Sequence, residues 1–197
     1  MPGGGGTTIG GCSAAPPPSG GVALTTAFVP TTIQPGGVSL LTITLSNANA
    51  TAATLTSPLT DNLPGGLVIA PSPNAGTTCG SGGVGGGVVS APPGGATVSL
   101  STNSTIPGGT PFGSCTVTVR VIAPTLGSFL NTLDVGALVT TINGTDLVSN
   151  PNAASATLTA SVPLPTRPVP TLSEWAMILL AALFVLFGVA GMRRHAM

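Results

Sequence analysis

The middle of the chain, residues 22–162, alternates apolar and hydroxyl-bearing residues with a period of two. The three clearest runs are Leu41–Leu45, Cys115–Val121 and Ala154–Val162. One apolar face and one Ser/Thr face is the pattern of a half-buried antiparallel strand, and Val and Thr favour a pleated backbone. Shorter strands are expected at Val22–Phe28, Thr54–Leu59, Leu67–Ile69, Thr97–Leu100, Ser128–Leu133 and Ala137–Ile142.

Clusters of Pro, Gly and Asn separate the expected strands at short intervals. They fall at Gln34–Gly37, Asp61–Gly66, Pro92–Gly95, Pro107–Gly109 and Asn143–Gly144. Pro fixes φ and Gly adopts positive φ, so these clusters favour tight turns. About seven to nine short strands without a helical period predict an all-β fold, an immunoglobulin-like antiparallel β-sandwich over residues 22–162. The Gly-rich segment Cys79–Val89 is expected to be a mobile loop on the rim of the sandwich or a poorly paired edge.

The two ends of the chain differ from this middle part. Residues 1–21 are rich in Gly and Pro with almost no large apolar side chain, which predicts a disordered leader. Residues 163–175 form a Pro-rich linker, and residues 176–192 carry no charge. As a helix, residues 176–192 would be about 26 Å long, at the short end of what crosses a bilayer. We therefore predict a single transmembrane helix over 176–192 and a basic cytoplasmic tail at 193–197.

An aromatic residue and two cations flank the predicted span. Trp175 stands at its start, where an indole favours the membrane interface, and Arg193 and Arg194 close the other end. By the positive-inside rule the arginines lie in the cytoplasm and the sandwich lies outside the inner membrane. The alternative, a buried core helix, is disfavoured because an all-β domain offers it little to pack against.

Composition excludes several classes of function. The 197 residues include 29 Gly and 20 Pro, but only four Lys and Arg together and four Asp and Glu together, and the net charge is zero. All four cations are arginines spread along the chain, which cannot form the basic stripe that nucleic acid requires. No nucleic-acid partner is therefore expected. A charge-driven disordered chain is excluded as well, because 42% of the residues are hydrophobic.

The chain contains three cysteines, Cys12, Cys79 and Cys115. No metal site is expected, because there is no Cys-x-x-Cys pair and His195 lies at the far C-terminus. We predict a disulfide between Cys79 and Cys115, which would tie the Gly-rich segment to the best strand and would suit an exported domain. The alternative is two buried free thiols, and Cys12 would remain unpaired.

The C-terminal segment resembles a known sorting signal. Pro170-Thr-Leu-Ser-Glu-Trp175, the apolar run and the arginine pair together resemble the IPTL-CTERM protein-sorting signal of Gram-negative bacteria. Val169 stands where that family has Ile, and Ala176 where it usually has Gly. The resemblance implies recognition and processing by an exosortase-like membrane enzyme; the alternative is a plain single-pass anchor. The implied sorting motif consists of Val169, Pro170, Thr171, Leu172 and Trp175.

Residues 22–162 are also similar to the bacterial conserved-repeat surface domains, which occur in tandem in large exported proteins. The similarity is carried by Phe28–Gly37, Leu41–Asn49, Asp61–Leu67, Cys79–Gly80 and Cys115–Val119. These domains have no established activity, so the similarity implies fold and location. Residues 1–21 lack the basic start and apolar core of a signal peptide, and we expect the chain to be an N-terminally truncated piece of a longer exported protein.

Few residues are available for catalysis. Gly80–Gly85 fits G-x-G-x-x-G, but no helix is expected to follow it, and no cofactor is predicted. Asp61, Asp134 and Asp146 are too scattered in sequence to indicate an acid–base pair. Asp61 is interpreted as a turn former before Pro64-Gly-Gly. Asn103-Ser-Thr is one of three N-glycosylation sequons, a pattern of little weight in a bacterial chain.

The shortage of catalytic groups and the sorting-signal resemblance together predict a module of the bacterial cell envelope or surface that is not an enzyme and has a structural or adhesive role. Its expected partners are the membrane, an exosortase-like enzyme, neighbouring repeats and surface glycans. Two alternatives remain open. One is a permanently anchored single-pass receptor or secretion component, and the other is an envelope enzyme acting on glycans or peptides.

Overall fold

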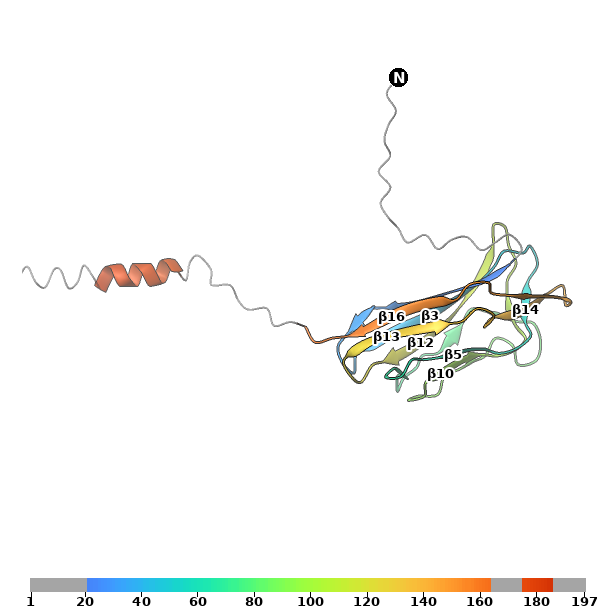
Figure 1. Ribbon diagram of the computed structural model, residues 1–197, viewed down its shortest axis with the longest axis horizontal. Coiled ribbons are helices and arrows are strands. Elements are labelled where there is room, and N and C mark those ends of the chain that lie inside the picture. Colours follow the sequence, from blue (N-terminus) through green and yellow to red (C-terminus); the bar gives the residue numbers. More distant parts are fainter. Residues whose placement is uncertain (1–20, 164–174, 186–197) are drawn as a thin grey trace, which may run out of the picture. The chain divides into compact units, whose positions relative to one another are not determined.

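The computed structural model of the protein describes residues 21–163 and 175–185 (Figure 1). The chain divides into two compact units, Met1–Val162 and Pro163–Met197. Several sequence predictions fall outside the described residues. These are residues 1–20 of the expected leader with Cys12, the sorting-motif residues Val169, Pro170, Thr171 and Leu172, and the basic tail with Arg193 and Arg194.

One layer of the first unit is a five-stranded antiparallel sheet. Its strands are β1 (Val22–Val29), β3 (Val38–Asn47), β12 (Gly113–Ile122), β6 (Val68–Ile69) and β7 (Gly76–Thr77). The order is β1-β3-β12-β6, and β7 also pairs with β12. Leu24 pairs with Leu45, and Leu45 pairs with Cys115. The apolar positions of the three long strands therefore share one face.

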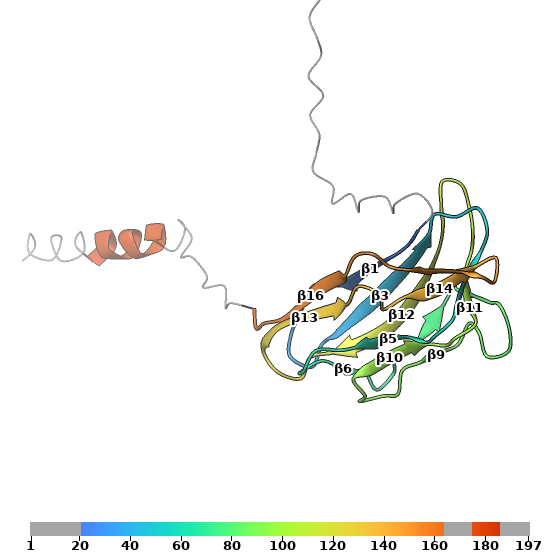
Figure 2. The same cartoon turned by 45° about the vertical axis from the view of Figure 1, so that its right-hand side comes forward.

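Three further sheets complete the unit, and Figure 2 shows β13 and β16, β5 and β10, and β14 around the first layer. The first is β5-β10-β9, made of β5 (Leu59–Asn62), β10 (Thr97–Leu100) and β9 (Val89–Ser90). The second is β13-β16-β2, made of β13 (Gly127–Leu133), β16 (Ala154–Ala160) and β2 (Thr32–Ile33). The third is β15-β14-β4-β11-β8, made of β15 (Asp146–Ser149), β14 (Val139–Ile142), β4 (Ala53–Leu55), β11 (Ser104–Ile106) and β8 (Gly80–Ser81).

The inward-facing side chains of these sheets form one hydrophobic core cluster. Strand β12 shows how the alternating sequence builds it, because Val117, Val119 and Val121 are buried while Arg120 is exposed. Burial of an aliphatic side chain of this kind contributes about 1.5–3 kcal/mol. The largest fully buried side chains are Phe28, Leu41, Ile43, Leu45, Leu55, Leu67, Ile69, Leu100, Ile106, Leu133, Leu138 and Leu158.

The all-β sandwich predicted from the alternating pattern is confirmed, although the described residues form sixteen strands where about seven to nine were expected. The run Thr54–Leu59, expected as one strand, is divided between β4 and β5, which lie in different sheets. Pro58 precedes β5, and a proline there cannot donate a backbone hydrogen bond to a continuous ladder. The pairing of β2 with β16 is parallel, so the described strands are not all antiparallel as expected.

The described part of the second unit is a helix over residues 175–185. Within the described ranges, 21–163 and 175–185, no helix combines the length and the apolar character needed to cross a membrane. The predicted span 176–192 runs past this helix, and its residues 186–192 lie outside the described part of the chain.

Candidate functional site

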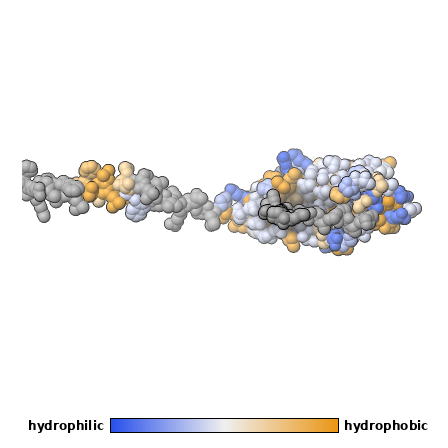
Figure 3. Space-filling view, turned by 90° about the horizontal axis from the view of Figure 1, so that it is seen from above, coloured by the Kyte–Doolittle hydropathy of each residue, from blue (hydrophilic) through white to orange (hydrophobic). Residues whose placement is uncertain are grey.

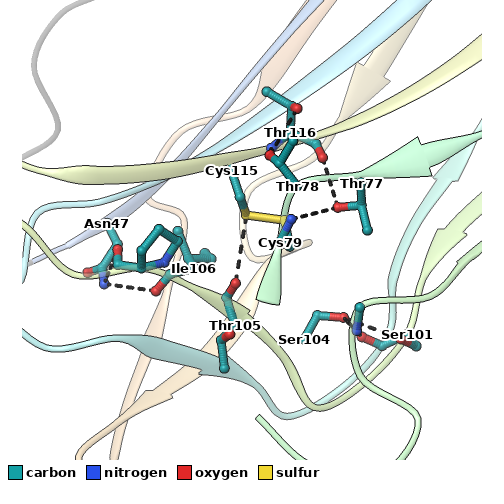
Figure 4. Close-up of a disulfide and its surroundings, with 12 residues drawn as sticks. Asn47, Thr77, Thr78, Cys79, Ser101, Ser104, Thr105, Ile106, Cys115 and Thr116 are labelled. Carbon is teal, nitrogen blue, oxygen red and sulfur yellow. Dashed lines mark hydrogen bonds between the residues drawn. A yellow bond between two sulfur atoms is a disulfide. The ribbon is translucent and has the colours of Figure 1, made fainter. Parts of the chain in front are cut away.

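A disulfide joins the core strand β12 to the segment that follows β7. Cys79 and Cys115 are bonded with an S–S distance of 2.06 Å and a Cα–Cα distance of 4.8 Å. Both residues are buried, and Figure 4 shows the bond between β12 and the start of the Gly-rich segment. The predicted disulfide is therefore confirmed, and the alternative of two free thiols is wrong.

Three threonines fasten the chain beside this disulfide. The Thr77 hydroxyl donates to the Thr116 carbonyl at 2.8 Å, and the Cys79 amide donates to Thr77 Oγ1 at 3.0 Å. The Thr116 amide donates to Thr78 Oγ1 at 2.9 Å, and the Thr78 amide returns a 2.9 Å bond to the Thr116 carbonyl. The side chains thus continue the pairing of β7 with β12 up to the disulfide (Figure 4).

The Gly-rich segment after Cys79 is a short edge held by the turn at residues 101–104. Strand β8 has two residues and pairs with β11 at the edge of its sheet. The Gly87 amide donates to Ser104 Oγ at 2.9 Å, and the Val88 amide donates to Ser101 Oγ at 3.1 Å. Of the two expectations for this segment, the poorly paired edge describes it.

Within this turn, Asn103 holds the Gly-rich segment through hydrogen bonds, a role that the sequence did not reveal. It has φ 59, its carbonyl accepts from the Gly82 amide at 2.7 Å, and its side-chain Nδ2 donates to the Val84 carbonyl at 3.2 Å. The sequon beginning at Asn103 is thus a turn that clamps the Gly-rich segment. Val84 lies beyond the clamp with 98% of its surface exposed.

Asp61 is not the turn former that the sequence suggested. It lies in β5 with its side chain buried, and its Oδ2 accepts a 2.7 Å hydrogen bond from Nδ2 of Asn131 in β13. Asn131 is buried as well. Burial raises the pKa of Asp61 above its usual value, and the hydrogen bond from Asn131 opposes part of that rise. The prediction of a turn former is wrong because the hydrogen-bond partner of Asp61, Asn131, is 70 residues away in sequence and local pattern does not reveal it.

The other two aspartates do not join Asp61 in a catalytic arrangement. Asp134 follows β13 and Asp146 begins β15, and both are exposed whereas Asp61 is buried. Among residues 21–163 and 175–185, no three His, Cys, Asp or Glu side chains gather in a way that could hold a metal ion.

Two buried asparagines organise loops and were also missed from sequence. Asn150 Oδ1 accepts from the Leu138 amide at 2.8 Å, and its Nδ2 donates to the carbonyls of Asp134 at 2.9 Å and Asn152 at 2.8 Å. Asn47 Nδ2 donates to the Thr51 carbonyl at 2.8 Å. Turn-forming residues are common in exposed loops, so the sequence offers no signal that these two are buried.

The fold and the disulfide define a disulfide-bonded β-sandwich with a separate apolar C-terminal helix. Residues 23–160 match the Domain of unknown function (DUF7933), which is more than half of the chain, so the chain belongs to that family. Residues 167–194 match the IPTL-CTERM motif, which bears out the sorting-signal resemblance.

Comparison with other proteins gives distant similarities in fold. BcpA, the major pilin subunit of Bacillus cereus, is 12% identical with a TM-score of 0.44 over 71% of this chain and 40% of its own. The collagen adhesin (CNA) from S. aureus is 16% identical with a TM-score of 0.39 over 71% and 48%. The PapD-like domain 7 of human CEP192 is 14% identical with a TM-score of 0.32 over 82% and 100%. No curated protein matches the chain, and the chain spans less than half of the first two structures.

Proposed function

We propose that the protein is an exported module of the bacterial cell envelope or surface, with a structural or adhesive role. The observation that carries the proposal is the IPTL-CTERM match at residues 167–194, directly after the sandwich. In this role the tail is a substrate segment, and Val169, Pro170, Thr171, Leu172 and Trp175 form the motif that an exosortase-like enzyme reads.

The apolar C-terminal segment supports a membrane span over 176–192. The helix at 175–185 exposes apolar side chains all round, among them Ile178 at 60%, Leu179 at 69% and Phe184 at 69%. A helix that is apolar on every side is stable inside a hydrophobic core or a bilayer. With Arg193 and Arg194 on the cytoplasmic side, the sandwich lies outside the inner membrane.

The chemistry of the sandwich supports an exported, non-enzymatic role. Its disulfide is of the kind that persists in oxidising compartments. Figure 3 shows a largely pale surface with scattered blue and orange areas, in keeping with few charges and many hydroxyls. The outer face of the first sheet places Thr25, Thr44 and Thr116 in one row across three strands. Such a face suits contact with surface glycans or neighbouring repeats.

The test is the intact mass of the full chain recovered from its native envelope. Loss of the segment after about Trp175 is expected, and Leu172→Ala should leave the tail uncleaved because it alters the motif. Ser173→Ala, at a variable position of the same motif, is the matched control and should be processed normally. A full-length tail on the wild-type chain would indicate a permanently anchored receptor or secretion component and would refute the processing.

A further inference from the structure

The sandwich contains a seam between strands that lie side by side without backbone pairing. Strands β5 and β13 contact one another, yet they belong to different three-stranded sheets. β5 pairs with β10, and β13 pairs with β16. The hydrogen bond between Asn131 Nδ2 and Asp61 Oδ2, at 2.7 Å, joins the two sheets across this seam.

Two oxygens of this pair have no hydrogen-bond partner. Asp61 Oδ1 and Asn131 Oδ1 are buried, and they are two of the three buried side-chain polar atoms left unpartnered in the described residues. Leaving a buried polar atom unpartnered costs about 1–3 kcal/mol. An ionised carboxylate offers only acceptors, as does the amide oxygen, so the two oxygens cannot satisfy each other while Asp61 is charged.

We propose that Asp61 is protonated in the folded domain and donates its Oδ1–H to Asn131 Oδ1, which closes a cyclic pair of two hydrogen bonds across the seam. One added proton satisfies both orphan oxygens. The acid–amide pair then acts as a neutral clasp between β5 and β13. Both hydrogen bonds are present at low pH, and the bond from Asp61 Oδ1–H is lost when Asp61 releases its proton.

The surroundings of Asp61 favour the neutral form. Strand β10 places the buried Val98 directly opposite it, and β13 contributes the uncharged Asn131. The other charged groups of the described residues, Arg120, Asp134 and Asp146, are all exposed. The buried inward positions of the two central strands of the facing sheet carry no charge: Ser39, Leu41, Ile43, Leu45 and Asn47 on β3, and Cys115, Val117, Val119 and Val121 on β12. These strands therefore present no charged side chain that would stabilise an Asp61 carboxylate, and burial raises the pKa of Asp61.

The direct test is the protonation of Asp61 in the full chain, solubilised in detergent and labelled with 13C at the aspartate carboxyl carbons. The chain has three aspartates, so the Asp61 resonance is the one lost in Asp61→Asn. Should that variant not fold, the resonance follows by elimination from Asp134→Asn and Asp146→Asn. We expect the Asp61 carboxyl to keep its protonated chemical shift well above the usual aspartate titration near about pH 3.9.

An infrared spectrum provides the second readout. A hydrogen-bonded carboxylic acid C=O band should persist above about pH 3.9, where an ordinary aspartate is ionised, in the wild-type chain and in Asp134→Asn, and should shift on 13C labelling of aspartate. An Asp61 resonance that titrates at or below about pH 3.9 would overturn the proposal. So would the absence of a protonated carboxyl band from the folded wild-type chain at about pH 5, where an ordinary aspartate has released its proton.

Discussion

The carbonyl of Asn103 occupies the space that a side chain on Gly86 would need. A Cβ built at Gly86 overlaps the Asn103 carbonyl carbon and oxygen. The same asparagine accepts from the Gly82 amide at 2.7 Å. The glycines of this segment therefore serve a close approach between two stretches of backbone, which the pairing of β8 with β11 places together at the edge of their sheet.

Gly86→Ala is expected to destabilise the domain by about 1–3 kcal/mol, because the added methyl must displace backbone and not a flexible side chain. Urea denaturation of the full chain measures the change. Gly83→Ala is the matched control, since its Cβ would lie an ordinary 3.6–3.7 Å from the Asn103 side chain. Equal stability of the two variants would contradict the close approach.

Loss of the disulfide should cost about 2–5 kcal/mol. The bond closes a loop with a sequence separation of 36 residues, and the chain-entropy model gives about 4 kcal/mol for a loop of this length. The change is measured as the difference in urea midpoint between Cys79→Ala/Cys115→Ala and the parent, both carrying Cys12→Ser. The parent should also lose stability on reduction, whereas a midpoint unaffected by reductant would show that the bond contributes little.

Asn150→Ala should destabilise the domain by about 1–3 kcal/mol, because the change removes the acceptor of the Leu138 amide and the side-chain donor to the Asn152 and Asp134 carbonyls, of which Asp134 keeps a bond from the Ala137 amide. Asn152→Ala is the control, since Asn152 is exposed and takes part in this cluster through its backbone carbonyl alone. Thermal unfolding of both variants gives the comparison. A control as destabilised as Asn150→Ala would place the effect in the loop and not in the buried amide.

Local pattern was sufficient for the long strands and insufficient for the short strands, the order of the sheets and the buried polar contacts. The alternation at Cys115–Val121 predicts β12 because one face of that strand is buried, and such burial leaves a period of two in the sequence. In sequence, Asp61 is followed by Pro64 and two glycines, as a turn residue would be. Asn131 lies beside it only in the folded chain. The pairing of Cys79 with Cys115 was predictable because few cysteines compete.

The pH dependence of stability provides a final prediction for Asp61. Burial raises its pKa in the folded chain, so the folded state holds the proton at pH values where the unfolded state, with a pKa of about 3.9, has released it. The stability that the proton contributes is complete below about pH 3.9 and is lost as the pH rises through the folded-state pKa. The total loss is about 1.4 kcal/mol for each unit by which folding raises the pKa of Asp61.

Asp61→Asn removes this dependence while keeping a neutral side chain of the same shape, whose amide can donate to Asn131 Oδ1 and accept from its Nδ2. The variant should match the wild-type chain near pH 4 and exceed it near pH 8, as measured by urea denaturation across this range. Asp134→Asn, at an exposed position, should keep the wild-type profile. If Asp61→Asn is less stable than the wild-type chain at every pH, the protonated pair is ruled out. The seam would then depend on an ionised Asp61 carboxylate that accepts the hydrogen bond from Asn131 Nδ2.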